Sequence, residues 1–357
     1  MVENINTINT INTPAFIVNE VVALNNIVKF QSYCDEMGLA LRPHIKTHKT
    51  VRFAKAQIDS GAIGITCQKI SEAEAMAVEG IDDILITYNI VGPNNLARLK
   101  VLSDSVKCLS VVADSSFVVC GLARTFESIS RPLNVLVECD TGAGRCGVQT
   151  PQAALQLAEE ISNFSGLVFG GLMTYPAVSG AKDAADFLLE TKRLLGSKGL
   201  LCNVISSGGS PDMWSAATFG VVTEYRVGTY IYNDRSLVER GTCSWGDCAG
   251  HVLATVISTP TPRRAIIDAG SKTLTSDLLG LRDYGHVIGH PEISIVGLSE
   301  EHGTLEIDPE NPLKIGQRIR IIPNHVCVVS NMFDNIWLEG IGSKLLKLKV
   351  DARGCVT

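Results

Sequence analysis

The chain has 357 residues, of which 45% are hydrophobic and 19% are charged, and its formal net charge is −6. This composition is typical of a globular protein with a large core, and it excludes a disordered, collagenous or coiled-coil chain. Because acidic residues outnumber basic ones and no lysine or arginine cluster stands out, we expect neither a nucleic acid nor an acidic membrane as partner. The natural partner is a small molecule.

Eleven cysteines are scattered from Cys34 to Cys355, with no CxxC pair among them. An odd number at irregular spacing in a chain of this length favours reduced thiols over a disulfide framework. No apolar run approaches the roughly 18 residues that a membrane span needs, and the N-terminal segment does not resemble a signal peptide. The sequence therefore predicts a cytoplasmic protein.

Short apolar runs alternate with helix-length amphipathic segments over the first two thirds of the chain. Residues 1–13, rich in Asn, Thr and Ile, are expected to form a flexible or edge-strand lead-in. Buried strands that each precede a helix predict an α/β fold, a parallel (β/α)8 TIM barrel, over residues 14–235. The eight expected strands are Ala15–Val18, Ala40–Ile45, Ile63–Cys67, Asp83–Thr87, Leu109–Ala113, Asn134–Glu138, Leu167–Met173 and Asn203–Ser206.

The helical pattern stops after about residue 235. Apolar runs separated by turn residues indicate an antiparallel β-domain over residues 236–357. These runs are Val252–Ile257, Arg264–Asp268, Ile293–Val296, Gln317–Ile322 and Lys344–Val350. Since catalytic groups of barrels stand at the C-terminal ends of the strands, polar residues that directly follow an apolar run are the first candidates for a site.

The stretch Arg42–Lys49 carries two histidines and two lysines where a barrel strand is expected to end. Read as a strand, it places His44, Lys46 and His48 on one face. Desolvation in a pocket lowers the pKa of a lysine, which makes its amine a nucleophile able to form a Schiff base with an aldehyde. Taken by itself, a solvated basic loop explains the stretch equally well.

Glycine-rich turns follow other strand candidates. Ser206–Ser210 contains Gly208 and Gly209, and Gly228–Thr229 forms a second short turn. Such turns let backbone N–H groups approach a phosphate, although each alone is more simply a plain turn. A third glycine-rich loop, Glu138–Gly147, carries one arginine.

Together these motifs resemble the fold-type III pyridoxal-phosphate enzymes, and among them the D-threonine aldolase and D-serine dehydratase family. The resemblance implies an alanine-racemase-like fold, with a barrel, a β-domain and active sites shared between the subunits of a homodimer. The motifs span nearly the whole chain: Arg42–Lys49, Thr66–Lys69, Gly142–Gly147, Thr223–Tyr230, Asp268–Lys272, Glu301–Gly303 and Pro323–Cys327.

The resemblance also implies roles for single residues. Lys46 would hold pyridoxal 5'-phosphate as a Schiff base, Arg145 would lie near the pyridine nitrogen and Tyr175 near the phenolic oxygen. The permanent charge of Arg145 disfavours protonation of the ring nitrogen, so the ring is a weaker electron sink and another group must assist. The remaining cofactor residues implied by the family are Gln68, Ser207, Gly208, Gly209, Gly228 and Thr229.

His325 and Cys327 are separated by one residue on a segment that reads as a strand, so both side chains would face one ion. Imidazole and thiolate favour zinc, with manganese as the alternative. Two protein ligands leave positions open for water and a substrate hydroxyl, which is typical of a catalytic site. Without the other motifs, the pair is more simply two unrelated core residues.

We expect a lyase that depends on pyridoxal phosphate and a divalent metal and cleaves D-3-hydroxy amino acids to glycine and an aldehyde. The alternative is a D-serine or D-threo-3-hydroxyaspartate dehydratase, which eliminates water and then releases ammonia. Family members with His-x-Cys are typically dehydratases, so Cys327 favours elimination, whereas residues 223–234 and 268–277 look more like aldolases. A racemase or a non-catalytic cofactor carrier is less favoured, because neither uses the metal pair.

A second tier of candidates comprises His44, His48, Asp268, Lys272 and His302. The two histidines of the Lys46 segment would pack under the cofactor and hydrogen-bond its neighbours. Asp268 and Lys272 would either reach the pocket of the partner subunit or form an internal salt bridge.

Overall fold

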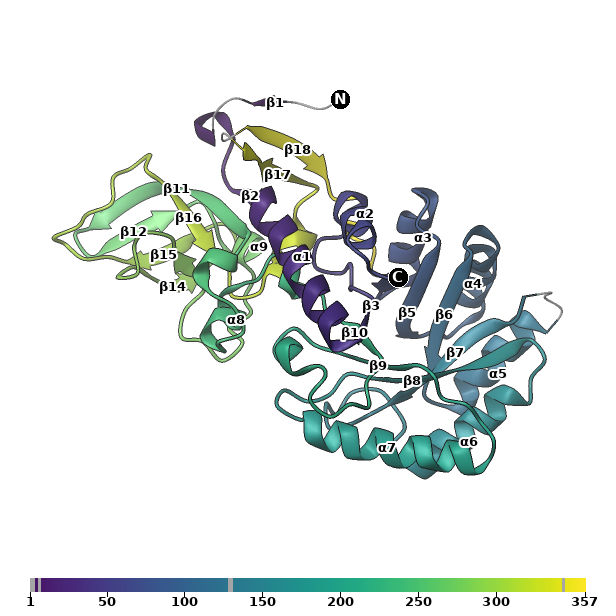
Figure 1. Cartoon of the computed structure of the whole chain (residues 1–357). Coiled ribbons are helices and arrows are strands. Elements are labelled where there is room, and N and C mark those ends of the chain that lie inside the picture. Colours follow the sequence, from purple (N-terminus) through teal and green to yellow (C-terminus); the bar gives the residue numbers. More distant parts are fainter. Residues whose placement is uncertain (1–3, 6–7, 128–130, 342–343) are drawn as a thin grey trace. The chain divides into compact units, whose positions relative to one another are not determined.

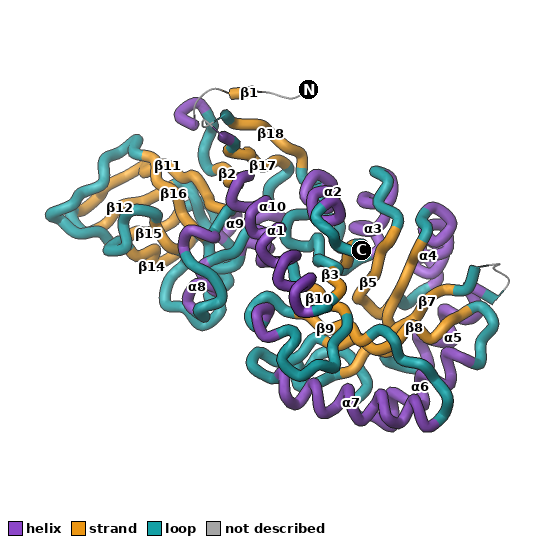
Figure 2. The backbone as a smooth tube through the Cα atoms, viewed as in Figure 1, coloured by secondary structure: helices purple, strands orange, loops and turns teal. Residues whose placement is uncertain are grey.

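The computed structural model describes residues 4–5, 8–127, 131–341 and 344–357 (Figures 1 and 2). The chain divides into two compact units. The barrel unit consists of Lys29–Lys46, Val51–Gly228 and Cys355–Thr357, and the β unit consists of Met1–Val28, Thr47–Thr50 and Thr229–Gly354.

Eight parallel strands form the sheet of the barrel unit. They are β3 (Ala40–Leu41), β4 (Ile65–Cys67), β5 (Asp83–Asn89), β6 (Cys108–Ala113), β7 (Leu133–Cys139), β8 (Leu167–Thr174), β9 (Ile205–Gly208) and β10 (Glu224–Arg226). Their order is β3-β10-β9-β8-β7-β6-β5-β4, and a parallel bridge between His44 and Thr66 joins the two ends. The predicted barrel is thereby confirmed.

Helices alternate with these strands and lie on the outside of the sheet (Figure 1). They are α2 (Val51–Asp59), α3 (Ile70–Val78), α4 (Pro93–Ser105), α5 (Ser116–Phe126), α6 (Pro151–Ser162) and α7 (Ala181–Ser197). Helix α6 shows why such segments are helical: the Thr150 side chain caps its N-terminus and Pro151 occupies its first turn. Its buried residues recur at helical spacing and face the barrel: Ala154, Leu157, Ala158 and Ile161.

One expected barrel strand lies in the other sheet. Strand β2 (Ala15–Asn19) pairs antiparallel with β11 (Gly250–Thr261) and parallel with β17 (Asn335–Glu339), so the assignment of Ala15–Val18 to the barrel is wrong. The eighth barrel strand is β10, which contains two charged residues and therefore lacks an apolar run. The four buried residues of β2 suit any fully covered strand, and only long-range pairing selects its sheet.

The β unit is built on a ten-stranded sheet. Besides β2, β11 and β17 it contains β1 (Asn4–Ile5), β12 (Arg264–Ile267), β13 (His286–Val287), β14 (Ser294–Leu298), β15 (Gly303–Glu306), β16 (Arg318–Ile322) and β18 (Leu345–Lys349). Its described pairings are antiparallel except for β17 with β2. The expected antiparallel β-domain is confirmed with that one exception.

Short helices interrupt the β unit: α8 (Arg235–Glu239), α9 (Ser271–Leu274) and α10 (Val326–Met332). The long helix α1 (Glu20–Met37) follows β2. None of the helices in the described ranges is both long enough and apolar enough to cross a membrane.

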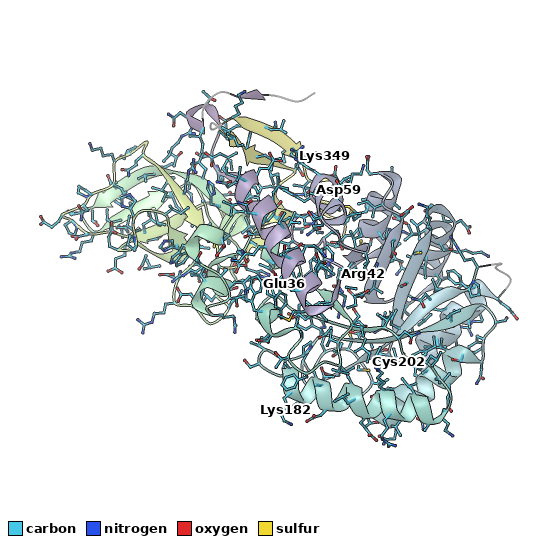
Figure 3. All side chains as sticks on the ribbon, viewed as in Figure 1. Glu36, Arg42, Asp59, Lys182, Cys202 and Lys349 are labelled. Carbon is cyan, nitrogen blue, oxygen red and sulfur yellow. The ribbon has the colours of Figure 1, made fainter. Side chains whose placement is uncertain are left out.

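A buried ion-pair network joins strands of the barrel. Arg42, which follows β3 and is labelled in Figure 3, donates from Nε to Glu224 at 2.8 Å and from a terminal nitrogen to Asp83 at 2.6 Å. Burial alone would lower the pKa of Arg42, but the charges of Glu224 and Asp83 raise it. Because the two carboxylates lie on β10 and β5, the network ties β3 to strands from both halves of the sheet order.

Candidate active site

Lys46 lies in a turn that begins a few residues after β3 ends at Leu41, so the expected strand over Arg42–Lys49 is wrong. The histidines of this stretch explain the turn. The Lys46 N–H donates to Nδ1 of His44 at 3.3 Å, and the Thr50 N–H donates to Nδ1 of His48 at 3.1 Å. Because side chains satisfy these backbone donors, the chain can leave the sheet without burying an unpaired N–H group.

His44 connects the lysine to Gln68. Its Nε2 lies 3.1 Å from Oε1 of Gln68, whose Nε2 donates to the backbone carbonyl of Thr87 at 2.9 Å. Since Nδ1 of His44 accepts from Lys46 and Nε2 faces an amide oxygen, these contacts favour the tautomer that carries its proton on Nε2. The structure thus brings His44, Lys46 and Gln68 together at one end of the barrel strands.

The two glycine turns meet at the end of β9 and β10. The Gly209 N–H donates to the carbonyl of Arg226 at 3.0 Å, and Gly209 has a φ of +132°. A Cβ added to Gly208 would lie 2.3 Å from the same carbonyl oxygen. Only glycine allows this approach, so the strand ends carrying Ser207, Gly208 and Gly228 lie side by side, as a phosphate cradle requires.

Arg145 and Tyr175 also meet within the barrel unit. The guanidinium carbon of Arg145 lies 5.0 Å from the centre of the Tyr175 ring, a cation–π contact. A Cβ added to Gly209 would lie 3.7 Å from the same ring. The loop carrying Arg145 is shaped by Asp140, whose carboxylate accepts from the backbone of Gly142 and Gly144. Gly209, Tyr175 and Arg145 thus lie together and fit the phosphate and ring of a phosphorylated aldehyde, and Lys46 supplies an amine able to bind the aldehyde.

Two buried charged residues of the barrel strands, Arg226 and Glu138, were not predicted from the sequence as site residues. Arg226 is buried on β10 and donates from Nε to Ser206 at 2.9 Å, and Ser206 in turn donates to Glu224 at 2.6 Å. Glu138 at the end of β7 is also buried, and burial raises its pKa to about 7 with a further contribution from Asp114. Charged residues inside short barrel strands are the sequence signal that could have identified them.

The metal candidates are arranged differently from the sequence expectation. Cys327 lies in the first turn of α10 and His325 directly precedes that helix, so the segment is not a strand. Asp234 explains the helix, because its carboxylate accepts from the Val326 N–H at 3.1 Å. His325 keeps an extended backbone (φ −135°, ψ 91°), and its side chain still hydrogen-bonds that of Cys327.

Other polar groups of the β unit surround this pair. Nδ1 of His325 lies 2.7 Å from Oδ2 of Asp277. The thiol of Cys327 lies 3.1 Å from Oγ1 of Thr47 and 3.4 Å from Oγ1 of Thr229. The hydrogen bond with Cys327 raises the pKa of His325 to about 9, although burial lowers it. The charge of Cys327 and the hydrogen bond with Asp277 raise this pKa further.

An imidazole in direct contact with a thiol, and oriented by a carboxylate, is a donor set that fits zinc. Among the described residues, one cluster brings three possible metal ligands within 4.8 Å of one another. It consists of Asp114, Glu138 and Cys146 and lies in the barrel unit. Within the described part of the chain, His325 and Cys327 therefore belong to no group of three or more such residues.

Contacts within the β unit account for Asp268 and Lys272 of the second tier. Asp268 accepts from the Thr13 hydroxyl at 2.5 Å and from the Thr255 N–H at 2.7 Å. Lys272 pairs with Glu300 and Glu301 at the surface. His302 is exposed, whereas His44 and His48 are buried. The internal salt bridge fits Lys272, and hydrogen bonds account for Asp268.

Known proteins are similar to this chain over almost its whole length. The family models for the alanine racemase N-terminal domain and the putative serine dehydratase domain match residues 23–236 and 249–338. D-threonine aldolase from Arthrobacter sp. is 32% identical, with 96% of this chain and 93% of that protein covered. D-threo-3-hydroxyaspartate dehydratase from Delftia sp. is 31% identical, with coverages of 92% and 94%.

A solved structure points the same way. The crystal structure of D-threonine aldolase from Filomicrobium marinum superposes with a TM-score of 0.91 at 28% identity, covering 98% of both chains. The same relatives thus cover both the barrel and the β-domain of this chain. The chain therefore belongs to the D-threonine aldolase and D-serine dehydratase family of fold-type III pyridoxal-phosphate enzymes, and like those relatives it is a lyase.

Proposed function

We propose that this lyase acts on D-3-hydroxy amino acids with pyridoxal 5'-phosphate and a divalent metal, and that it cleaves them to glycine and an aldehyde. The observation that carries the proposal is the environment of Cys327. Its thiol contacts His325, Thr47 and Thr229, and these threonines directly follow Lys46 and Gly228 in the chain. The sequence itself thus links the metal candidates to the cofactor candidates.

Pyridoxal phosphate supplies an electron sink for a bond at Cα, and a divalent metal lowers the pKa of a hydroxyl that it binds. Lys46 carries the amine that would attach the cofactor and give way to the substrate amine. His325 and Cys327 would hold the metal, which would bind the β-hydroxyl of the substrate. Loss of the hydroxyl proton to solvent would then favour cleavage of the Cα–Cβ bond, whose electron pair the cofactor ring would accept.

The cofactor pocket has further named contributors. Gly208 and Gly228 would present backbone N–H groups to the phosphate, and Ser207 and Thr229 would add hydroxyl groups. Gly209, whose own N–H is taken by the carbonyl of Arg226, would keep the turn open for the phosphate. Arg145 would place a permanent charge near the ring nitrogen and Tyr175 would lie near the phenolic oxygen, and the two side chains contact each other. Gln68 is held by His44 and Thr87 and lines the same pocket.

A dehydratase is the second candidate, and Cys327 is the observation that favours it. His-x-Cys is the pattern of the dehydratases in this family, and a dehydratase is among the similar relatives. In this reaction the amine of Lys46 would take the Cα proton, and the metal held by His325 and Cys327 would stabilise the departing hydroxide. Only the bond that breaks at Cα differs between the two reactions.

The protein is further proposed to bind zinc, with manganese as the alternative, and to work as a cytoplasmic homodimer. The cytoplasmic location is proposed because eleven cysteines at irregular spacing favour reduced thiols. Light scattering of the purified protein tests the dimer, and a monomeric mass contradicts it.

Product analysis distinguishes the two reactions. The protein loaded with cofactor and zinc is incubated with D-threonine, D-serine and D-threo-3-hydroxyaspartate. Glycine with an aldehyde supports the aldolase, whereas ammonia with a keto acid supports the dehydratase and contradicts the first proposal. Equal turnover of L-threonine contradicts D-specificity, and an unchanged rate after chelation removes His325 and Cys327 from the mechanism.

A further inference from the structure

The side chain of Asp277 contacts His325, the histidine of the two candidate metal ligands His325 and Cys327. Its Oδ2 lies 2.7 Å from Nδ1 of His325, although the two residues are 48 positions apart in the chain. Both side chains are partly shielded, with 41% of Asp277 and 30% of His325 exposed. The distance is that of a charge-assisted hydrogen bond.

The backbone of Asp277 is fixed against the residue before His325. Asn324 is buried, and its side-chain amide donates to the carbonyl oxygens of Asp277 at 3.3 Å and Asp283 at 2.6 Å. The Asp277 N–H donates to the Thr275 hydroxyl at 3.2 Å. The carboxylate and the imidazole are therefore held together by main-chain and side-chain contacts at once.

The same region holds the start of α10 in place. Buried Asp234 accepts from the N–H groups of Val326 and Leu237 with its two carboxylate oxygens, and so ties α10 to α8. Because Asp277 occupies Nδ1 of His325, Nε2 is the ring nitrogen left to bind a metal. A carboxylate on Nδ1 keeps the proton on that nitrogen and increases the basicity of Nε2 toward a metal.

We propose that Asp277 is a positioning residue, which holds His325 in the tautomer and ring orientation that present Nε2 to the divalent metal. The inference rests on the proposed function, since it assumes that His325 and Cys327 bind that metal. No sequence motif assigned Asp277 this role. Contacts of this kind typically contribute a factor of about 10–100 to metal affinity.

The test is the zinc dissociation constant, measured by competition with a chromophoric chelator on the cofactor-loaded protein. Asp277→Ala is expected to weaken binding by about 10–100-fold. Asp277→Asn is expected to lose less than about tenfold, because its amide oxygen still accepts from Nδ1. The cofactor absorption and the unfolding temperature of each variant establish that it is folded.

Glu292→Ala is the matched control, because it removes a carboxylate 3.1 Å from Nδ1 of the exposed His290. Its zinc affinity is expected to equal that of the wild type. The inference is overturned if the zinc dissociation constant of Asp277→Ala lies within twofold of the wild-type value, or if Asp277→Asn binds zinc no more tightly than Asp277→Ala. Either result leaves the proposed function standing. If His325→Ala binds zinc as tightly as the wild type, the metal site of the proposed function is itself wrong and the inference falls with it.

Discussion

At the scale of single residues, hydrogen-bond partners decide what each side chain can do. The sequence predicts that His44 packs under the cofactor and hydrogen-bonds its neighbours, and the structure adds that its partners are the Lys46 N–H and the Gln68 amide oxygen. Glu138 and Arg226 carry charges into the barrel although neither stood out in the sequence. The sequence gives the type of each side chain, whereas the pKa and the tautomer of that side chain depend on the neighbours that the fold brings to it.

Replacement of Lys46 by alanine is expected to abolish the visible absorption of the cofactor Schiff base and the lyase activity. The physical reason is that the side-chain amine is the group that forms the bond with the aldehyde. The measurement is the absorption spectrum after incubation with pyridoxal phosphate and dialysis. Lys182→Ala, on the exposed face of α7, serves as the control and should retain both. A visible band that survives Lys46→Ala would place the cofactor elsewhere.

Glu138→Gln is expected to make stability less dependent on pH. Burial and Asp114 raise the pKa of Glu138 from 4.5 to about 7. Between pH 4.5 and 7 the folded protein keeps this proton while the unfolded chain loses it, so wild-type stability falls as the pH rises through that range. At pH 8 the variant should be more stable by on the order of 3 kcal/mol, and at pH 4.5 the two should be equal.

Urea unfolding of wild-type and Glu138→Gln protein at both pH values checks this. A stability difference that is the same at pH 4.5 and pH 8 would show that Glu138 keeps an ordinary pKa in the fold.

At the scale of elements, two segments that carry candidate residues are not the strands that their spacing indicated. The Lys46 segment turns because histidine rings accept from its backbone N–H groups. The His325 segment becomes the start of α10 because Asp234, distant in sequence, accepts from Val326. In both segments the alternating pattern of residues indicated a strand. A side-chain acceptor instead satisfies a backbone N–H group that would otherwise pair with a neighbouring strand.

Gly208→Ala is expected to disrupt the phosphate cradle, because its Cβ would lie 2.3 Å from the carbonyl oxygen of Arg226. The ends of β9 and β10 must then separate, and we expect a loss of about 1–3 kcal/mol in unfolding free energy together with weaker cofactor binding. Fluorescence titration with pyridoxal phosphate and urea unfolding measure the two effects.

Gly196→Ala in α7 is the matched control, because a Cβ there meets nothing within 4 Å. This variant should instead gain about 0.5–1 kcal/mol, since alanine favours a helix more than glycine does. Equal behaviour of the two variants would contradict the close approach at Gly208.

At the scale of the barrel as a whole, closure depends on contacts between residues far apart in sequence. The His44–Thr66 bridge joins the ends of the strand order, and Arg42 ties β3 to β10 and β5. These polar contacts lie among strands whose apolar residues form the interior, such as Leu85, Val112, Leu136 and Met173.

Arg42→Ala is expected to lower the unfolding free energy by about 3–5 kcal/mol, because it leaves the buried carboxylate of Glu224 without its partner. Urea unfolding followed by circular dichroism measures the loss. Arg193→Ala removes an exposed pair with Glu190 and should leave stability close to that of the wild type, because solvent screens such a pair. A loss for Arg42→Ala as small as that of the control would exclude a role for the network in barrel stability.

The sequence by itself determined the fold class, the family and the residue types of the candidate site. Apolar runs followed by amphipathic helices are local patterns, and motifs such as Arg42–Lys49 and Pro323–Cys327 keep their chemistry whatever the backbone does. These features are readable because they depend on spacing along the chain.

Only the tertiary structure decided which strand completes the barrel, where the two candidate segments turn, and which carboxylate meets His325. Strand β2 is apolar enough for either sheet, and β10 is a strand because Glu224 and Arg226 find buried partners across the barrel. Asp277 lies 48 residues before the histidine that it contacts. Pairing energies between distant residues decide these features, and no local pattern encodes them.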